Sequence, residues 1–451
     1  MKKIACAFAV FILALPCFHT PAKAFEPTSF ELHCEAAILI NMDTETVVFE
    51  YSKDGGGSSS RVYPASITKI MTAVVVLEKQ SDLEEIVEVP DYCIELLVGT
   101  NSSNAGLVGG EKMSVRDLLY CLMVSSANDA ANVLADHFGA GTGEARIADF
   151  ISQMNRRAGE LQMTGTHFAN AHGLHDENHY TTIDDLVKLV NHAMELPLFM
   201  ELCETTRYEI PATGMNEARI LSTTNMMMDS STSFYYKGIS GVKTGYTEEA
   251  GRCLISTARQ NGFRYLCVVM GCPPEDENGE ILYYQYEDTE NLYDWAFDTF
   301  EYKLIVQTSE PLQEIKVNLS SDADHVQLYP ERSFSSLVPK EADTSSVITN
   351  IRLFSDEIDA PVVKGAVLGT ADIVYAGEVL GQVNLVAGQD VERSIVLYII
   401  RQLGEMTHTL WFKLAAGLIG GSLLLLIILT VIQNRRQRMR YSRKRSASRK
   451  T

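Results

Sequence analysis

The chain of 451 residues lacks the clusters and repeats that mark several common kinds of protein. It has no internal repeat, which argues against a solenoid or a propeller. It contains 58 aspartate and glutamate residues, yet they form no clustered ligand pattern for a divalent cation. No cysteine stands in a Cys/His arrangement that would support a thiol nucleophile. The sequence therefore predicts neither a bound metal ion nor any other cofactor.

The cysteines of the chain do not define a disulfide framework. Two of the nine cysteines lie in the first 24 residues, which leaves an odd number in the rest of the chain. Most of these seven stand in apolar runs, so we expect them to pack as small core side chains. A disulfide is possible, but its pairing does not follow from the sequence. The seven are Cys34, Cys93, Cys121, Cys203, Cys253, Cys267 and Cys272.

Acidic residues are absent from the last eighteen positions, although the whole chain carries a formal charge of −20. This tail contributes +9 and residues 1–24 contribute +3, which leaves −32 for residues 25–433. Such an acidic segment is repelled by anionic lipids and polymers, which favours solubility over surface adhesion.

The two ends of the chain predict export and a membrane anchor. Residues 1–24 have a basic start, an apolar run and a small-residue end at Ala24, as in a secretory signal peptide. Residues 414–432 are apolar and uncharged, long enough for a transmembrane helix. The basic tail at 433–451 should then be cytoplasmic and the main part outside, by the positive-inside rule. Directly behind a membrane span, this tail is not expected to bind nucleic acid.

Three short motifs follow one another in the exported part: Ser66-Ile67-Thr68-Lys69, Ser126-Ala127-Asn128 and Lys243-Thr244-Gly245. They match the S-x-x-K, S-x-N and K-T-G elements of active-site-serine enzymes that recognise penicillin. A chain of this length contains roughly two S-x-x-K matches by chance, and roughly one such chain in ten contains K-T-G. The three in this order therefore predict a serine acyl-transfer enzyme.

The first motif pairs a nucleophile with a base. Ser66 precedes a helical pattern over residues 67–80, and a helix N-terminus favours developing negative charge. Lys69 lies one turn further on the same face, so its amine can reach the Ser66 hydroxyl. Apolar neighbours would lower the pKa of Lys69 and let it act as a base. An isolated S-x-x-K would instead be an N-cap serine with a lysine directed to solvent.

The second motif stands between two helical stretches, 115–124 and 130–137. A break between helices can direct short polar side chains into a cleft. Ser126 is suited to relay a proton from Lys69 to a leaving amine, and Asn128 can orient Lys69 and bind a substrate amide. A capping serine and a turn asparagine are the structural alternative.

The third motif is expected on a strand that lines the cleft. Two β-rich runs follow it, 253–258 and 263–270, joined by an Asn-Gly turn that predicts a hairpin. A strand edge can pair with an extended peptide. Lys243 supplies positive charge, Thr244 a hydroxyl, and Gly245 room for close approach of the backbone, as binding of a free carboxylate requires.

The sequence around these motifs resembles the D-alanyl-D-alanine carboxypeptidases, the low-molecular-weight penicillin-binding proteins of the serine-peptidase type. The resemblance is strong over about residues 30–300 and looser beyond. Besides the three motifs and their flanks, it rests on Asn170-Ala171-His172-Gly173-Leu174, Thr224-Asn225 and Ala250-Gly251. It implies a substrate, the peptidoglycan stem peptide ending in D-Ala-D-Ala, and inhibition by β-lactam antibiotics.

The same resemblance implies a role for each motif residue. Ser66 would be acylated with Lys69 as its base, and Ser126 and Asn128 would complete the proton relay. Lys243, Thr244 and Gly245 would hold the substrate. The backbone N–H groups of Ser66 and Tyr246 would form the oxyanion hole.

The chain departs from the family at one position. Many relatives place an arginine that anchors the substrate carboxylate shortly before an aromatic-x-Asp-Thr sequence. Gln285 stands there, in a stretch that we expect to be an unpatterned loop. An amide offers no charged bidentate fork. Either another cation substitutes, with Arg252 and Arg264 near in sequence, or carboxypeptidase turnover is reduced.

The resemblance and the sequence pattern together give an α/β fold class. Residues 25–302 should form a β-lactamase/transpeptidase-like catalytic domain, an antiparallel sheet flanked by helices plus a helical subdomain. A hairpin over residues 36–51 should join the strands of residues 243–270 in that sheet. Short β-like runs suggest a small β-sandwich at 303–390, and residues 391–413 look like a helical connector.

Three alternatives stay open. His172 and His175, with His167 and His179 nearby, could hold zinc, but the serine chemistry needs no metal. A β-lactamase shares the motifs and would need a carboxylate for deacylation, for which Glu177 is the candidate. A non-catalytic wall-binding protein would have a degenerate site, and the intact motif residues argue against it.

Overall fold

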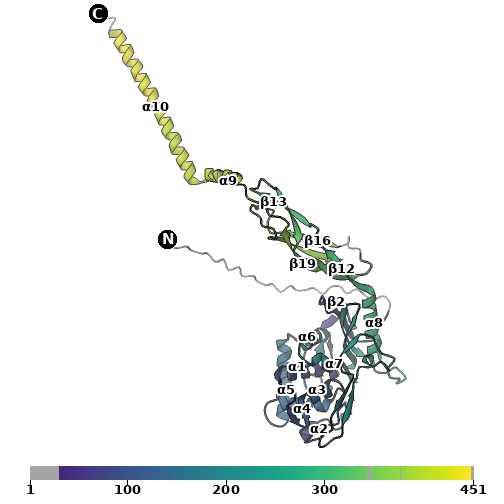
Figure 1. Ribbon diagram of the computed structural model, residues 1–451. Helices are drawn as coiled ribbons and strands as arrows, with labels where there is room; N and C mark the ends of the chain where they lie inside the picture. Colours follow the sequence, from purple (N-terminus) through teal and green to yellow (C-terminus); the bar gives the residue numbers. More distant parts are fainter. Residues whose placement is uncertain (1–29, 343–346, 376, 448–451) are drawn as a thin grey trace. The chain divides into compact units, whose positions relative to one another are not determined.

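The computed structural model describes residues 30–342, 347–375 and 377–447 (Figure 1). The chain forms two compact units, with the division between Glu301 and Tyr302. The expected signal peptide at 1–24 lies outside the described residues.

The first unit is built on a five-stranded antiparallel sheet. Its order is β2-β1-β11-β10-β9, so strands from the two ends of the unit lie side by side. The strands are β1 (Ala36–Asn41), β2 (Thr46–Ser52), β9 (Ile239–Thr247), β10 (Gly251–Gln260) and β11 (Phe263–Cys272). The expected N-terminal hairpin and its union with the K-T-G strands are confirmed.

Local turn chemistry sets the register of this sheet. Asn261 and Gly262 both have positive φ, 52° and 89°, as the tight turn between two twisted strands requires. The turn pairs Gln260 with Phe263 and fixes the β10–β11 register. Because β9 ends the sheet order, one edge of the K-T-G strand is not used by the sheet.

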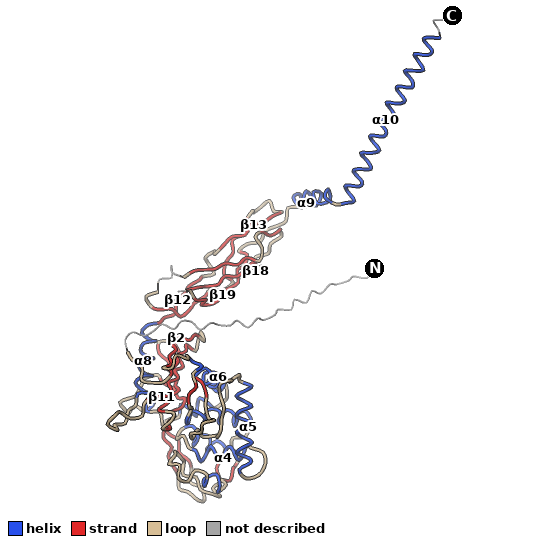
Figure 2. The backbone as a smooth tube through the Cα atoms, turned by 180° about the vertical axis from the view of Figure 1, so that it is seen from behind, coloured by secondary structure: helices blue, strands red, loops and turns tan. Residues whose placement is uncertain are grey.

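Helices cover both faces of the sheet. The helix α8 (Tyr284–Thr299) contacts β10 and β11, whereas α6 (Ile183–Met194) contacts β1 and β11. Figure 2 shows α8 and α6 on opposite sides of β11. The expected unpatterned loop around Gln285 is therefore wrong, because these residues begin α8. Its buried residues follow helical spacing along one face, but Gln285, Asp288 and Thr289 among them are polar, so the sequence shows no clear apolar stripe.

The remaining helices form the subdomain on the side of α6. The helix α1 (Lys69–Lys79) runs through its centre, with every residue from Lys69 to Val76 buried. A helix that is apolar nearly all round is a core helix. The others are α2 (Asp91–Glu95), α3 (Val115–Met123), α4 (Asn128–Phe138), α5 (Glu144–Glu160), α6 (Ile183–Met194) and α7 (Phe199–Glu204).

Short elements complete the first unit. Single-turn helices are η1 (Gly57–Ser59), η2 (Ala65–Thr68) and η3 (Met226–Met228). Three small ribbons pair β3 (Arg61–Val62) with β6 (Thr181–Thr182), β4 (Ile86–Glu88) with β5 (Lys112–Ser114), and β7 (Arg207–Ile210) with β8 (Arg219–Ser222).

The second unit is rich in β-strands, as expected. A six-stranded sheet has the order β16-β18-β19-β14-β13-β17, and β12 pairs with β15 in a ribbon. Inward-facing aliphatic residues of β13, β14, β18 and β19 form its core. The strands are β12 (Phe300–Val306), β13 (Gln313–Asn318), β14 (His325–Pro330), β15 (Phe334–Pro339), β16 (Ile348–Leu353), β17 (Glu357–Asp359), β18 (Val367–Tyr375) and β19 (Glu378–Ala387).

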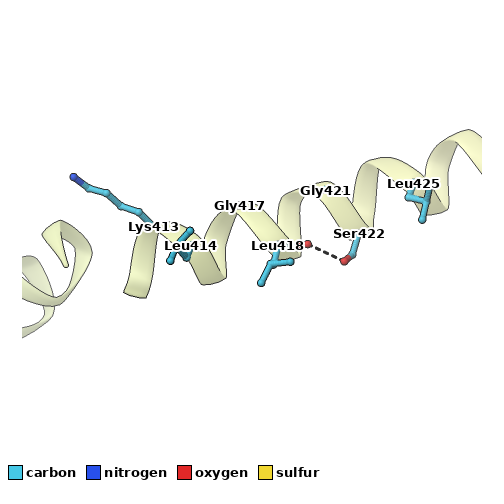
Figure 3. Close-up of a pocket in the computed structure, with 7 residues that line it drawn as sticks. All are labelled: Lys413, Leu414, Gly417, Leu418, Gly421, Ser422 and Leu425. Atoms are coloured by element: carbon cyan, nitrogen blue, oxygen red, sulfur yellow. Dashed lines mark hydrogen bonds between the residues drawn. The ribbon is translucent and has the colours of Figure 1, made fainter. Parts of the chain in front are cut away.

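Two helices end the chain, α9 (Ile395–His408) and α10 (Leu410–Ala447). By length and composition, the segment Leu410–Arg438 of α10 can cross a membrane, and an 18-residue stretch within it has a mean hydropathy of 2.5. The helix thus begins before the expected span at 414–432 and continues through it into the basic tail. Figure 3 shows a shallow groove at Gly417 and Gly421, beside which the Ser422 hydroxyl donates to the Leu418 carbonyl.

Candidate active site

The S-x-x-K serine lies on a tight turn that enters α1. Ser66 is the second residue of η2, and the preceding Ala65 has a φ of 45°. This left-handed conformation costs a residue with a Cβ roughly 1–2 kcal/mol, so the surrounding structure must hold it. The expected helix over 67–80 is present, with its first turn in the 3₁₀ form.

The amine of Lys69 lies at the centre of the site. Its Nζ is 2.9 Å from Ser66 Oγ, 2.6 Å from Asn128 Oδ1 and 2.7 Å from the carbonyl oxygen of His172. The amide and carbonyl oxygens can only accept hydrogen bonds. In the neutral amine they engage both N–H groups, so the lone pair is left for the Ser66 hydroxyl to donate to.

The surroundings of Lys69 favour that neutral form. Lys69 is completely buried, and burial is the main reason that its pKa is well below the ordinary lysine value. The positive charge of Lys243 lowers the pKa further, while Asp129 acts in the opposite direction. An amine with a lowered pKa can take a proton from Ser66.

The S-x-N motif forms the junction between α3 and α4. Ser126 is buried with a φ of 60°, and Asn128 begins α4. Asp129 accepts hydrogen bonds from the backbone N–H groups of Ala105 and Leu107, which fixes the preceding loop over the motif. Among the described residues, the hydrogen bonds of Lys69 do not include Ser126. The structure thus brings Asn128 onto Lys69 and leaves the Ser126 hydroxyl free of that contact.

The K-T-G strand β9 packs directly against the nucleophile turn. A Cβ at Gly245 would lie 3.2 Å from the carbonyl oxygen of Pro64 and 3.3 Å from the Cβ of Ala65. Glycine therefore allows β9 to approach Ser66. Tyr246, the next residue, is 45% exposed at the end of the motif.

The other two residues of this motif differ in their surroundings. Lys243 is buried, which lowers its pKa to about 7, and its Nζ donates to the Thr244 carbonyl at 3.1 Å. The Thr244 hydroxyl lies 2.5 Å from that of Thr224. Thr224 belongs to the Thr-Asn pair of the resemblance, and this contact gives that pair a place in the site.

The segment around His172 supports the nucleophile through its backbone. Gly173 has a φ of 95°, and a Cβ there would lie 1.8 Å from the carbonyl oxygen of Ala65. Thr72 of α1 donates to the carbonyl of Ala171 at 2.6 Å. The Asn-Ala-His-Gly-Leu segment contributes to the family resemblance of the sequence. No feature of the sequence, however, predicts that the His172 carbonyl contacts Lys69.

Two of the four histidines considered for zinc, His172 and His179, are engaged by other groups of the protein. His172 Nδ1 accepts from the Leu174 N–H, and burial lowers the pKa of this ring to about 3. His179 Nδ1 accepts from the Ala169 N–H, its Nε2 lies 2.6 Å from Thr68 Oγ1, and burial lowers its pKa to about 4. Residues 30–447, as far as they are described, contain no group of three or more such side chains able to hold a metal ion.

One of the two candidate substitute cations lies away from the site. Arg264 at the start of β11 forms an ion pair with Asp43 in the β1–β2 turn, at 2.7 Å. Gln285, in the first turn of α8, is 4% exposed, and its Oε1 has no hydrogen-bond partner. The arginine expected there is therefore replaced by a buried neutral amide.

Comparison with known proteins agrees with this geometry. A family model described as D-alanyl-D-alanine carboxypeptidase matches residues 22–273, and a model of the penicillin-binding protein 5 C-terminal domain matches residues 300–393. The chain is 27% identical to the D-alanyl-D-alanine carboxypeptidase DacF of Bacillus subtilis, covering 83% of this chain and 90% of the relative. It is also 27% identical to DacA of Escherichia coli, covering 91% and 98%.

Two solved structures are similar as well. The Streptomyces K15 DD-transpeptidase has 30% identity and a TM-score of 0.53, and the match covers 60% of this chain and 99% of that one. Penicillin-binding protein 5 of Haemophilus influenzae has a TM-score of 0.58 at 24% identity, covering 82% and 100%, which extends the fold likeness into the second unit.

Proposed function

Because the chain belongs to the D-alanyl-D-alanine carboxypeptidase family of serine peptidases, we propose that Ser66 is the nucleophile that forms the acyl-enzyme in the carboxypeptidase reaction. The Ser66 Oγ attacks the carbonyl of the penultimate D-alanine of a peptidoglycan pentapeptide stem. The bond from Oγ to that carbon forms, and the peptide C–N bond breaks. Water then hydrolyses the ester in a second step, so the reaction follows an acyl-enzyme route.

Each proton in this route has a proposed carrier. Lys69 accepts the Ser66 proton, and Ser126 passes a proton to the nitrogen of the departing D-alanine. Asn128 orients Lys69 and binds a substrate amide. The backbone N–H groups of Ser66 and Tyr246 stabilise the oxyanion, a contribution of roughly 3–4 kcal/mol for one such donor in well-studied serine enzymes. No cofactor takes part.

The substrate lies along the free edge of β9 in this proposal. Lys243, Thr244 and Gly245 contact the extended peptide as an added strand would. A β-lactam would acylate Ser66 in the same position and inhibit the enzyme.

One observation carries the proposal: the completely buried Lys69 amine lies between Ser66 Oγ and two oxygens that can only accept. An N-cap serine with a lysine directed to solvent would have an exposed amine. For the β-lactamase alternative, Glu177 is exposed, and none of its described contacts reaches Ser66 or Lys69. This favours the carboxypeptidase over a Glu-dependent β-lactamase.

We propose that the catalytic unit faces the outside of the cytoplasmic membrane. The segment Leu410–Arg438 would cross the bilayer, and the basic tail would lie in the cytoplasm. Peptidoglycan is outside that membrane, so this topology brings the enzyme to its substrate.

The direct test measures free D-alanine released from a Lys-D-Ala-D-Ala peptide by the full chain in detergent. Release should vanish in Ser66→Ala, while the variant keeps the wild-type Tm. No release by folded wild type would contradict the carboxypeptidase proposal, and rapid repeated hydrolysis of penicillin would support the β-lactamase.

A further inference from the structure

The proposed substrate ends in a free carboxylate, and the inference below rests on that proposed function. Such a carboxylate is bound best by a charged group with fixed N–H donors. Gln285 is neutral, and Arg264 is paired with Asp43 at another end of the sheet. The two lysines of the site are buried and already hydrogen-bonded to oxygen atoms of the protein. Lys243 is the cation that the proposed function assigns to the substrate, and its single ammonium group lacks the planar fork of a guanidinium.

The strand beside the K-T-G motif supplies a guanidinium. Arg252 lies on β10 directly opposite Tyr246 of β9, and Leu254 lies opposite Thr244. Directly opposite residues point to the same face of an antiparallel sheet, as do residues two apart on one strand. Arg252, Tyr246 and Thr244 therefore share one face, next to the motif that we assign to the carboxylate end of the substrate.

The guanidinium of Arg252 is held by aromatic rings. Its Cζ lies 5.1 Å from the centre of the Tyr246 ring and 4.7 Å from that of Tyr283. Both distances fall in the range of cation–π attraction. Tyr283 comes immediately before α8, the helix that carries Gln285. The Arg252 side chain therefore contacts both the K-T-G strand and the start of this helix.

Arg252 has no acidic partner within the described part of the chain. Its Nε is buried and makes no hydrogen bond, which is also true of the Nε atoms of Arg157 and Arg219, so the difference lies in the missing carboxylate. Elsewhere in this unit, arginines with buried atoms are paired with carboxylates, as Arg219 is with Glu111 and Arg157 with Glu78. A guanidinium held by two rings and not paired with a carboxylate keeps its Nη donors available for an incoming anion.

We propose that Arg252 binds the terminal carboxylate of the substrate, in place of the arginine that Gln285 has replaced. The same contact would bind the carboxylate of a penicillin. Tyr246 then has two functions: its backbone N–H is aimed at the oxyanion, and its ring positions the guanidinium.

The test compares two substrates that differ only in charge, Lys-D-Ala-D-Ala with a free carboxylate and the same peptide with a C-terminal carboxamide. Arg252→Ala should lower kcat/KM for the acid by about 10- to 100-fold, the range for losing a hydrogen bond to a charged group. The carboxamide should change by less than about threefold, because it lacks the charge. Arg252→Lys should retain part of the preference for the acid.

Two further variants complete the design. Gln285→Arg in the Arg252→Ala background should restore preference for the acid, since it returns a guanidinium to the same face of the site. Arg264→Ala is the matched control, because it removes an arginine of the same sheet that is paired with Asp43. Unchanged discrimination between acid and carboxamide in folded Arg252→Ala would overturn the proposal.

A penicillin arm separates this proposal from the proposed function. If wild type releases no D-alanine, the carboxypeptidase proposal fails, but the rate of Ser66 acylation by benzylpenicillin still tests Arg252. Acylation of Arg252→Ala slowed by a similar factor would support the contact, and acylation at the wild-type rate would contradict it.

Discussion

The two compact units differ most in what they bury. Of the 26 polar or charged residues that are buried in the described parts of the chain, 24 lie in the first unit. The second unit buries only Ser336 and Asp372, and its core consists of inward-facing Val, Ile, Leu and Ala. A buried polar group costs free energy unless it is hydrogen-bonded. The first unit therefore depends on hydrogen bonds to offset the free energy of burying polar groups, whereas the second unit buries few such groups.

This difference reflects what each unit has to do. In the first unit, buried polar groups fix one another: Asn128 holds Lys69, and Asp129 holds the loop above it. In the second unit, alternation of buried and exposed residues on strands such as β13 and β14 is enough to make a stable sheet. A substitution of equal size should thus have larger functional effects in the first unit.

The largest difference in acylation rate should come from replacing Lys69 in the first unit, compared with replacing Lys316 in the second. Lys69→Ala should lower the rate of acylation by a fluorescent penicillin by about 1,000-fold or more, because the base for Ser66 is lost. The control is Lys316→Ala in the second unit, where the lysine forms an exposed ion pair with Glu357. Its labelling rate should equal that of wild type. Normal labelling of Lys69→Ala would show that another group activates Ser66.

Two glycines offer a matched comparison of backbone. Gly173 and Gly365 both have positive φ, 95° and 85°, so alanine strains each by roughly 1–2 kcal/mol. At Gly173 the new Cβ would also lie 1.8 Å from the Ala65 carbonyl oxygen, whereas at Gly365 nothing lies within 4 Å. Gly173→Ala should thus lower the Tm more and also slow acylation, since Ala65 precedes Ser66.

Thermal unfolding and penicillin labelling of both variants check this prediction. Equal losses of Tm, with unchanged labelling in Gly173→Ala, would mean that the His172 segment does not support the nucleophile turn.

These contrasts also show what the sequence could predict. The hairpin, the β10–β11 turn and the helices that flank the S-x-N motif depend on local patterns, and the structure confirms them. The contact of the His172 carbonyl with Lys69 joins residues 103 apart through a backbone atom, so no side-chain pattern marks it. Helix α8 escapes prediction for a different reason: its buried face includes the polar residues Gln285, Asp288 and Thr289, which weaken the apolar periodicity.

The placement of cations shows the same limit. The sequence alone does not distinguish Arg252 from Arg264, since both lie close to the K-T-G motif along the chain. Strand register separates them: Arg252 is opposite Tyr246, while Arg264 is opposite Arg259 near the far turn. Register depends on the pairing of whole strands, which distance along the chain does not give.

The buried lysines predict a pH dependence that the second unit should lack. Burial lowers the pKa of Lys243 to about 7 in the folded chain from 10.5. Between these values the unfolded chain binds more protons, so stability rises with pH over this window. The slope from one such group is at most about 1.4 kcal/mol per pH unit.

Tm measurements at pH 7 and pH 9 check this in wild type and Lys243→Met. The variant should gain less stability with pH than wild type, because its side chain has no proton to lose. Lys316→Met, in the second unit, should follow the wild-type curve. An identical pH dependence in wild type and Lys243→Met would mean that Lys243 is not desolvated in solution.

The smallest effect concerns the thiols, all of which lie in the first unit within the described residues. The seven cysteines from Cys34 to Cys272 are free and buried, and burial raises the pKa of Cys93 and Cys253 to about 12. Thiolates react, whereas buried thiols do not. A disulfide-exchange reagent should therefore leave acylation unchanged and detect these thiols only after unfolding. Rapid reaction of the native chain would show that the first unit opens locally, and that its buried polar network is less rigid than its hydrogen bonds imply.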